Sequence, residues 1–70
     1  MISTMPDKEV RKLVSNLRKK WTTEATFHTY ERHIEMLGMV LLRCSDSMTT
    51  LVQATIEEAS DRQMRVLFGT

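Results

Sequence analysis

The histidines are the first residues to test for chemistry, because a neutral imidazole binds metal ions and carries protons. His28 and His33 are the only two in the 70-residue chain. Five residues apart on one helix, they fall on different faces and cannot hold one ion together. Glu24 lies one turn before His28, but two ligands are too few for a structural metal. We interpret His28 as a solvated histidine and predict no metal site and no cofactor.

Carboxylates and a single thiol complete the reactive groups. Acidic side chains pair on two predicted helix faces, at Glu31 with Glu35 and at Glu57 with Glu58. General acid–base catalysis needs two carboxyls that converge on a cleft, and no such cleft is indicated. Cys44 falls on an apolar stripe, which favours a small core residue over an activated nucleophile. The two glycines are too far apart for a phosphate-binding loop. The sequence therefore predicts no catalytic residues, and a protein that is not an enzyme.

A basic face on the first predicted helix is the sharpest candidate for binding. It consists of Lys8, Arg11, Lys12, Arg18, Lys19 and Lys20. Residues 1–21 hold these six cations against two acids, whereas residues 22–70 hold four cations against seven acids. Six cations on one helix suit phosphate, but nucleic-acid-binding domains are usually basic as a whole. Three interpretations stay open: nucleic acid, an acidic protein, or solvent alone.

Composition limits the class of protein further. One cysteine allows no disulfide within the chain and favours a reducing compartment, so we expect a cytoplasmic protein. No stretch approaches the roughly 20 apolar residues that span a bilayer, and the first residues lack the order of a signal peptide, so no membrane contact is expected. Two glycines and one proline indicate few turns and long elements.

Three helices are predicted to position these residues, and they make a single all-α domain over residues 1–70. The first spans about 5–21, with Val10, Val14, Leu17 and Trp21 on one apolar stripe. The second spans about 24–44 on a heptad-like pattern and is expected to be long and central. The third spans about 47–68. Residues 60–63 resemble a new helix start, so it is expected either to continue or to break near Ser60.

The second helix also predicts self-association. From Met36 to Leu42 it is apolar on every side, and two neighbouring helices in so short a chain cannot easily cover it. Such small domains usually need a staple, and a second copy is the simplest one here. We therefore expect a three-helix unit that pairs into a symmetric dimer, with Gly38 at a close helix crossing.

Function is predicted from these surfaces. The leading hypothesis is a small non-enzymatic interaction module, an adaptor, regulatory subunit or inhibitor of phage or plasmid type, which docks a larger, unidentified protein. Its partner or dimer interface is expected at Trp21, Met36, Met39, Val40, Leu42 and Phe68. The alternative is a dimeric nucleic-acid-binding transcriptional regulator that uses the basic face.

Overall fold

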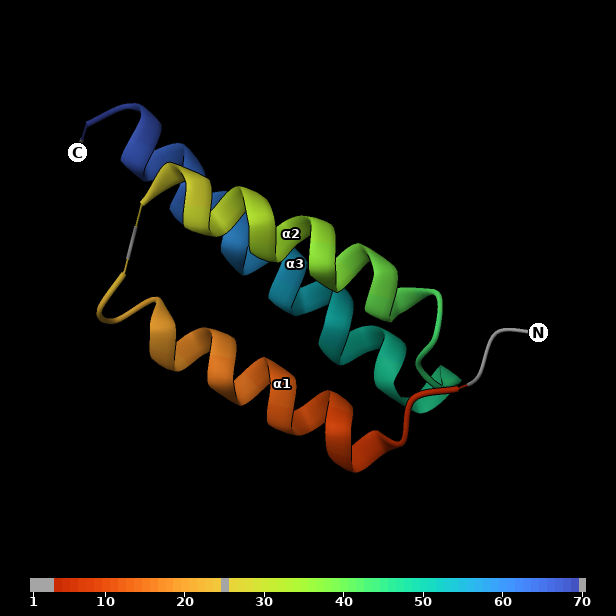
Figure 1. Ribbon diagram of the computed structural model, residues 1–70. Coiled ribbons are helices and arrows are strands. Elements are labelled where there is room, and N and C mark those ends of the chain that lie inside the picture. The colour runs from red at the N-terminus through yellow and green to blue at the C-terminus, as the bar shows by residue number, and fades with distance from the viewer. Residues whose placement is uncertain (1–3, 25, 70) are drawn as a thin grey trace.

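A computed structural model describes residues 4–24 and 26–69 of the chain. These residues form three helices: α1 (Asp7–Lys20), α2 (Phe27–Leu41) and α3 (Asp46–Leu67). The chain runs along α1, back along α2 and forward again along α3, so α1 and α3 are parallel to each other (Figure 1). The bundle is elongated, with extents of 41 × 19 × 17 Å. The predicted all-helical fold is confirmed.

The first helix begins later than the sequence indicated and ends close to the expected residue. Pro6 occupies the N-cap position, and the helix begins at Asp7 rather than near residue 5. The carboxylate in the first turn complements the positive end of the helix dipole. At the other end, the hydroxyls of Thr22 and Thr23 donate to the carbonyls of Lys19 and Lys20, at 2.6 and 3.2 Å. These threonines therefore close α1 instead of capping the next helix.

The second helix is shorter than predicted. Thr26 caps it, because its hydroxyl accepts the backbone N–H of Thr29 at 3.2 Å. It ends at Leu41 and has 15 residues, fewer than the expected span of 24–44. The longest helix is α3, with 22 residues. The prediction of a long central helix was wrong. Residue 25, which that prediction placed inside the helix, lies outside the described residues.

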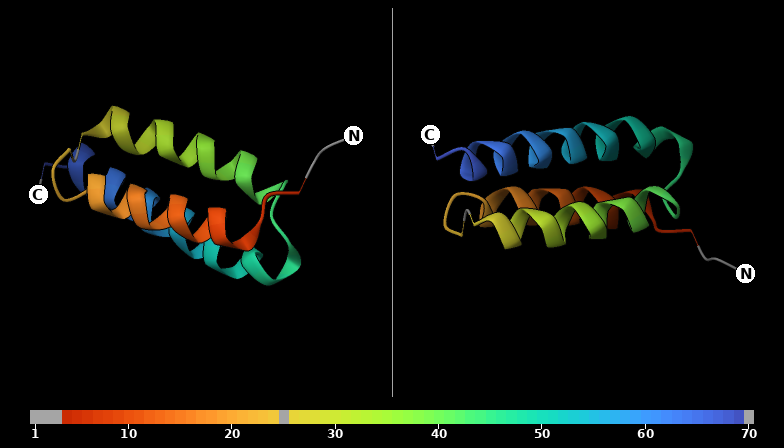
Figure 2. Two further views of the ribbon diagram at one scale, coloured as in Figure 1. Left: turned by 60° about the horizontal axis from the view of Figure 1, so that its bottom comes forward. Right: turned by 90° about the horizontal axis from the view of Figure 1, so that it is seen from above.

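The third helix is continuous from Asp46 to Leu67, so no break occurs near Ser60. Ala59 beside it is fully buried, and the segment contains neither glycine nor proline, so packing favours continuation over a new cap. The last turn of α3 extends beyond the neighbouring ends of α1 and α2 (Figures 1 and 2). That projection leaves its apolar side chains without a core to cover them.

One core joins the three helices. Its apolar members are Val10, Val14, Leu17, Trp21, Tyr30, Leu37, Val40, Met48, Val52 and Ala59. Two polar residues are buried with them, His33 and Thr55. The Thr55 hydroxyl donates to the Leu51 carbonyl at 2.7 Å, so its burial leaves no unpaired donor. Within one chain the other two helices cover only part of the apolar segment Met36–Leu42: Leu37 and Val40 are buried, whereas Met39 and Leu42 are exposed.

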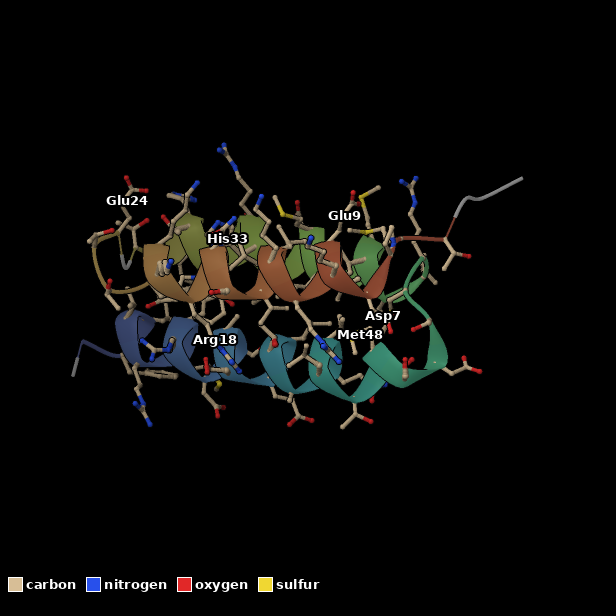
Figure 3. The ribbon with its side chains drawn as sticks, turned by 90° about the horizontal axis from the view of Figure 1, so that it is seen from below. Asp7, Glu9, Arg18, Glu24, His33 and Met48 are labelled. Carbon is tan, nitrogen blue, oxygen red and sulfur yellow. The ribbon has the colours of Figure 1, made fainter. Side chains whose placement is uncertain are left out.

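Polar contacts fasten α1 to the α2–α3 pair, whose two helices pack most closely against each other. At the start of α1 the Asp7 carboxylate accepts the hydroxyls of Ser45 and Ser47, at 2.7 and 3.2 Å. The Met5 backbone N–H donates to the Arg43 carbonyl at 2.8 Å. Figure 3 shows Asp7 at the end of the bundle where α3 begins. One carboxylate thus links the first turns of two helices.

Replacing Asp7 with alanine is therefore expected to lower the free energy of unfolding by about 1–2 kcal/mol, because two charge-assisted hydrogen bonds and a dipole interaction are lost. Urea unfolding followed by circular dichroism measures the change. Glu9→Ala is the matched control: it removes an exposed carboxylate from the same turn, and we expect a loss below about 0.5 kcal/mol. Equal losses in the two variants would show that the contacts of Asp7 with the serines are not stabilising.

Candidate functional site

Two members of the predicted interface are buried inside the chain. Trp21 is 2% exposed and Val40 is 5% exposed, and both belong to the core. The assignment of these two as partner-contacting residues was wrong, because the apolar stripes that suggested a surface anchor are the stripes that build the bundle. Gly38 meets no neighbouring atom within 4 Å of the position of a β-carbon, so no close helix crossing occurs there within one chain.

The other predicted interface residues are exposed and form two separate apolar surfaces. We call Met36, Met39 and Leu42 the α2 ridge; they lie three residues apart on the outer side of α2 and are 38, 59 and 79% exposed. We call Met64, Leu67 and Phe68 the α3 tip, of which only Phe68 was predicted. The spacing of the tip residues places them on one side of the helix end. The two surfaces lie toward opposite ends of the bundle (Figure 1).

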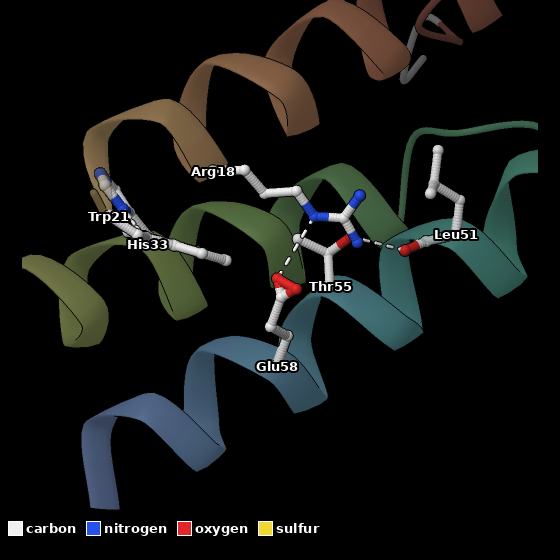
Figure 4. Close-up of polar contacts among 6 residues, drawn as sticks. All are labelled: Arg18, Trp21, His33, Leu51, Thr55 and Glu58. Carbon is white, nitrogen blue, oxygen red and sulfur yellow. Dashed lines mark hydrogen bonds and ion pairs between the residues drawn. The ribbon is translucent and has the colours of Figure 1, made fainter. Parts of the chain in front are cut away.

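The basic face is exposed as predicted, but its members differ in their surroundings. Lys8, Lys12 and Lys19 lie opposite the buried stripe of α1 and make no ion pair within the described residues. Arg18 instead reaches α3, where its Nε lies 3.3 Å from a carboxylate oxygen of Glu58 (Figure 4). Because both side chains are partly exposed, this pair contributes little to stability. Arg18 therefore already has an acidic partner on α3.

A buried polar cluster lies where α1 ends and α2 begins, and sequence reasoning missed it. The Trp21 indole N–H donates to Nδ1 of His33 at 2.8 Å (Figure 4). The Tyr30 ring packs against the indole with centroids 5.7 Å apart, and the Arg62 guanidinium lies 5.7 Å from the indole centroid on the α3 side. The cluster thus joins all three helices. His33 follows Tyr30 by three residues and precedes Leu37 by four, and that stripe spacing was the available signal.

The environment of His33 keeps its ring neutral. Burial lowers the pKa of the imidazole, and the charges of Lys20 and Arg32 lower it further, while Glu24 acts in the opposite direction. An indole N–H only donates, so Nδ1 of His33 must carry a lone pair. In the neutral ring the proton then resides on Nε2. The ring is 6% exposed and is held in one tautomer by its bond to Trp21.

A groove opens beside this cluster. It has a volume of about 390 Å³ and is lined by Lys20, Glu24, His28, Thr29, Arg32, His33 and Met36. Two formal cations face one carboxylate there. A second groove of about 340 Å³ crosses the outer surface of α3, where Glu57, Glu58 and Asp61 stand beside Arg62 and Arg65. The first groove is the more distinctive of the two, because it alone includes a buried polar side chain.

Comparison with known proteins found no match. No family model, no curated protein and no solved structure resembles this chain closely enough to be counted. Residues 4–24 and 26–69 include no group of three or more histidine, cysteine or acidic side chains placed to hold a metal ion. None of the helices in these residues is both long and apolar enough to cross a membrane.

Proposed function

We propose that the chain is a small non-enzymatic interaction module that works through exposed helical apolar surface. The observation that carries this proposal is the number of large apolar side chains left in solvent, which include the whole α2 ridge and the α3 tip. Contiguous apolar patches on the surface of a small domain usually mark sites that bind another molecule. Methionine supplies three of the six side chains, and its flexible thioether suits a surface that adapts to a partner.

The occupant proposed for the α2 ridge is a second copy of the chain. The protein exposes 5168 Å², whereas a compact monomer of 8.2 kDa exposes about 4,500 Å². The difference is of the same order as the roughly 800 Å² that each subunit contributes to a standard interface. Glu35 and Arg43 lie four residues on either side of Met39. An antiparallel pairing centred on Met39 brings each Glu35 level with the Arg43 of the second copy.

Sedimentation velocity from a few to several hundred micromolar tests this pairing. The protein is expected to become a dimer as concentration rises, and Met39→Lys is expected to keep it monomeric, because the variant buries a charge at the centre of the interface. Met64→Lys is the matched control: Met64 is 54% exposed and Met39 is 59% exposed. A folded monomer at all concentrations, or equal effects of the two lysines, would contradict the α2 interface.

The α3 tip is proposed to dock a partner protein. Anchors at positions i, i+3 and i+4 on a projecting helix end are the pattern by which an amphipathic helix enters an apolar groove. Affinity capture from the native host compares the protein with Leu67→Asp. Any protein retained through the tip is expected to be lost with that variant and kept with Met39→Lys. Retention of the same proteins by both variants would place the docking surface elsewhere.

Nucleic-acid binding through the basic face is the second candidate, supported by the three outward lysines of α1. The salt dependence of binding would distinguish nucleic-acid binding from docking through apolar surface. Each phosphate that the protein neutralises makes the affinity fall more steeply with salt concentration. A salt titration with random-sequence DNA measures this slope, and Lys12→Gln is expected to reduce it. Absence of binding at low salt would exclude this candidate. For either function a reducing compartment such as the cytoplasm is proposed, because Cys44 is a free thiol.

A further inference from the structure

The groove between the end of α1 and the start of α2 has features that neither apolar surface explains. Its cations come from two elements, with Lys20 at the end of α1 and Arg32 on α2. Glu24, in the connection between them, is its only carboxylate. Figure 3 shows Glu24 and His33 at the same end of the bundle. A volume of about 390 Å³ lies at the lower end of the range of about 300–1,000 Å³ for small-molecule sites.

His33 supplies the groove with an unused donor. His33 is more than nine-tenths buried, yet its Nε2–H has no partner among the described residues. No buried side-chain nitrogen or oxygen of those residues is left both sealed from solvent and unpaired. The Nε2–H must therefore reach solvent, and the groove is the space that the ring lines. The hydrogen bond from Trp21 to Nδ1 fixes the tautomer of the ring, so the Nε2–H donor is already oriented before any ligand binds.

The two cations lie close enough to His33 to act on it. The charges of Lys20 and Arg32 both disfavour a proton on the ring, and both residues line the same groove as His33. Three donors thus line one groove, an ammonium from α1 and a guanidinium and an imidazole from α2. A tetrahedral oxyanion accepts hydrogen bonds from several directions at once, whereas a planar carboxylate is satisfied by one guanidinium.

We propose that this groove binds the phosphate group of a small phosphate monoester, with the Lys20 ammonium, the Arg32 guanidinium and Nε2–H of His33 as its donors. Met36 and Thr29 at the rim are available to the organic part of the ligand. All these residues belong to one chain, so the proposal does not depend on self-association or on the docking of a partner protein. Loss of the dimer in Met39→Lys would leave it unaffected.

Titration at constant ionic strength tests the site. Inorganic phosphate, phenyl phosphate and a short single-stranded oligonucleotide are added to the full chain, and binding is followed by the fluorescence of Trp21, the only tryptophan, and by the NMR resonances of His33. Saturable shifts with phosphate, and tighter binding of phenyl phosphate, are expected. Shifts that sulfate and chloride reproduce would overturn the proposal. Tighter binding of the oligonucleotide would also overturn it, in favour of the basic face.

Charge variants decide whether the groove is the site. Arg32→Gln is expected to weaken phenyl phosphate binding about tenfold, because a charge-assisted hydrogen bond is lost. Glu24→Gln is expected to strengthen it about threefold, since the only repelling carboxylate disappears. Lys12→Gln and Glu57→Gln change the same charges far from the groove, where salt screens them, and should alter binding by less than about twofold.

Equal weakening by Arg32→Gln and Lys12→Gln would show attraction to overall charge and would overturn the proposal. Arg32 is exposed, so its variant should fold normally, and circular dichroism checks this. His33→Gln offers a further test, because its side chain can still accept from Trp21. Phenyl phosphate binding unchanged in both Arg32→Gln and His33→Gln would exclude the groove.

Discussion

Trp21→Ala is expected to lose a large part of the free energy of unfolding. The indole is 2% exposed, contacts Tyr30 and His33, and lies beneath the guanidinium of Arg62. Removal of a buried tryptophan costs about 3–5 kcal/mol through lost contacts and the cavity left behind. A domain of 70 residues has a total stability of only about 3.5–10 kcal/mol. Urea unfolding monitored by far-ultraviolet circular dichroism measures the loss.

Two further variants separate the roles of the indole. Trp21→Phe keeps an aromatic ring but removes the N–H, so Nδ1 of His33 loses its donor, and we expect a loss of about 1–3 kcal/mol. His28→Ala removes an exposed ring from the same region, and we expect a change below about 0.5 kcal/mol. If Trp21→Ala unfolds within about 1 kcal/mol of the parent, the indole is not part of the core.

The helices were predictable because their buried stripes are local patterns, but their ends were not. Val10, Val14 and Leu17 repeat with helical spacing, and each proved to be buried. Thr22 and Thr23 lie between two helices, and their hydroxyls donate to carbonyls of the preceding one. A threonine hydroxyl can accept a backbone N–H at the start of a helix or donate to a carbonyl at its end, and only the path of the following chain decides which.

The candidate site was less predictable than the fold. Exposure of the basic face follows from its position opposite an apolar stripe, so it was correctly expected. His33 was overlooked, because a histidine in a stripe is buried only where it finds a partner. That partner, Trp21, lies twelve residues away on another helix. The apolar character of Trp21 suggested an anchor on the surface, whereas its side chain is buried where all three helices meet.

Three polar contacts join α1 to the other helices, one at its start and two near its end. Asp7 binds the serines at the start of α3, whereas Arg18 pairs with Glu58 and Trp21 binds His33 near the end of α1. The first two include charged groups at or near the surface. The last is buried and depends on a neutral imidazole. Protonation of His33 would place a hydrogen on Nδ1 against the indole N–H, so this hydrogen bond is lost when the imidazole takes up a proton.

Stability is accordingly expected to fall as the pH drops below about 6.5, the ordinary pKa of histidine. The pKa of His33 is lowered in the folded chain by burial and then by Lys20 and Arg32. Between the folded and unfolded pKa values the unfolded chain binds the extra proton, so lowering the pH favours unfolding. Within that window one such group changes the free energy of unfolding by about 1.4 kcal/mol per pH unit.

Urea unfolding at a series of pH values from 7.5 downward, with parent and His33→Gln compared at each step, isolates this term. Glutamine keeps an acceptor for Trp21 but does not titrate, so the stability of the parent relative to the variant should decline with acidity. His28→Gln, on the exposed side of the same helix, should retain the decline of the parent. Lys20, Arg32 and Glu24, the charged groups that act on the ring, are the same in both proteins, so the comparison cancels their own contribution. If the parent and His33→Gln lose stability equally as the pH falls, the hydrogen bond between Trp21 and His33 is not the pH-sensitive contact.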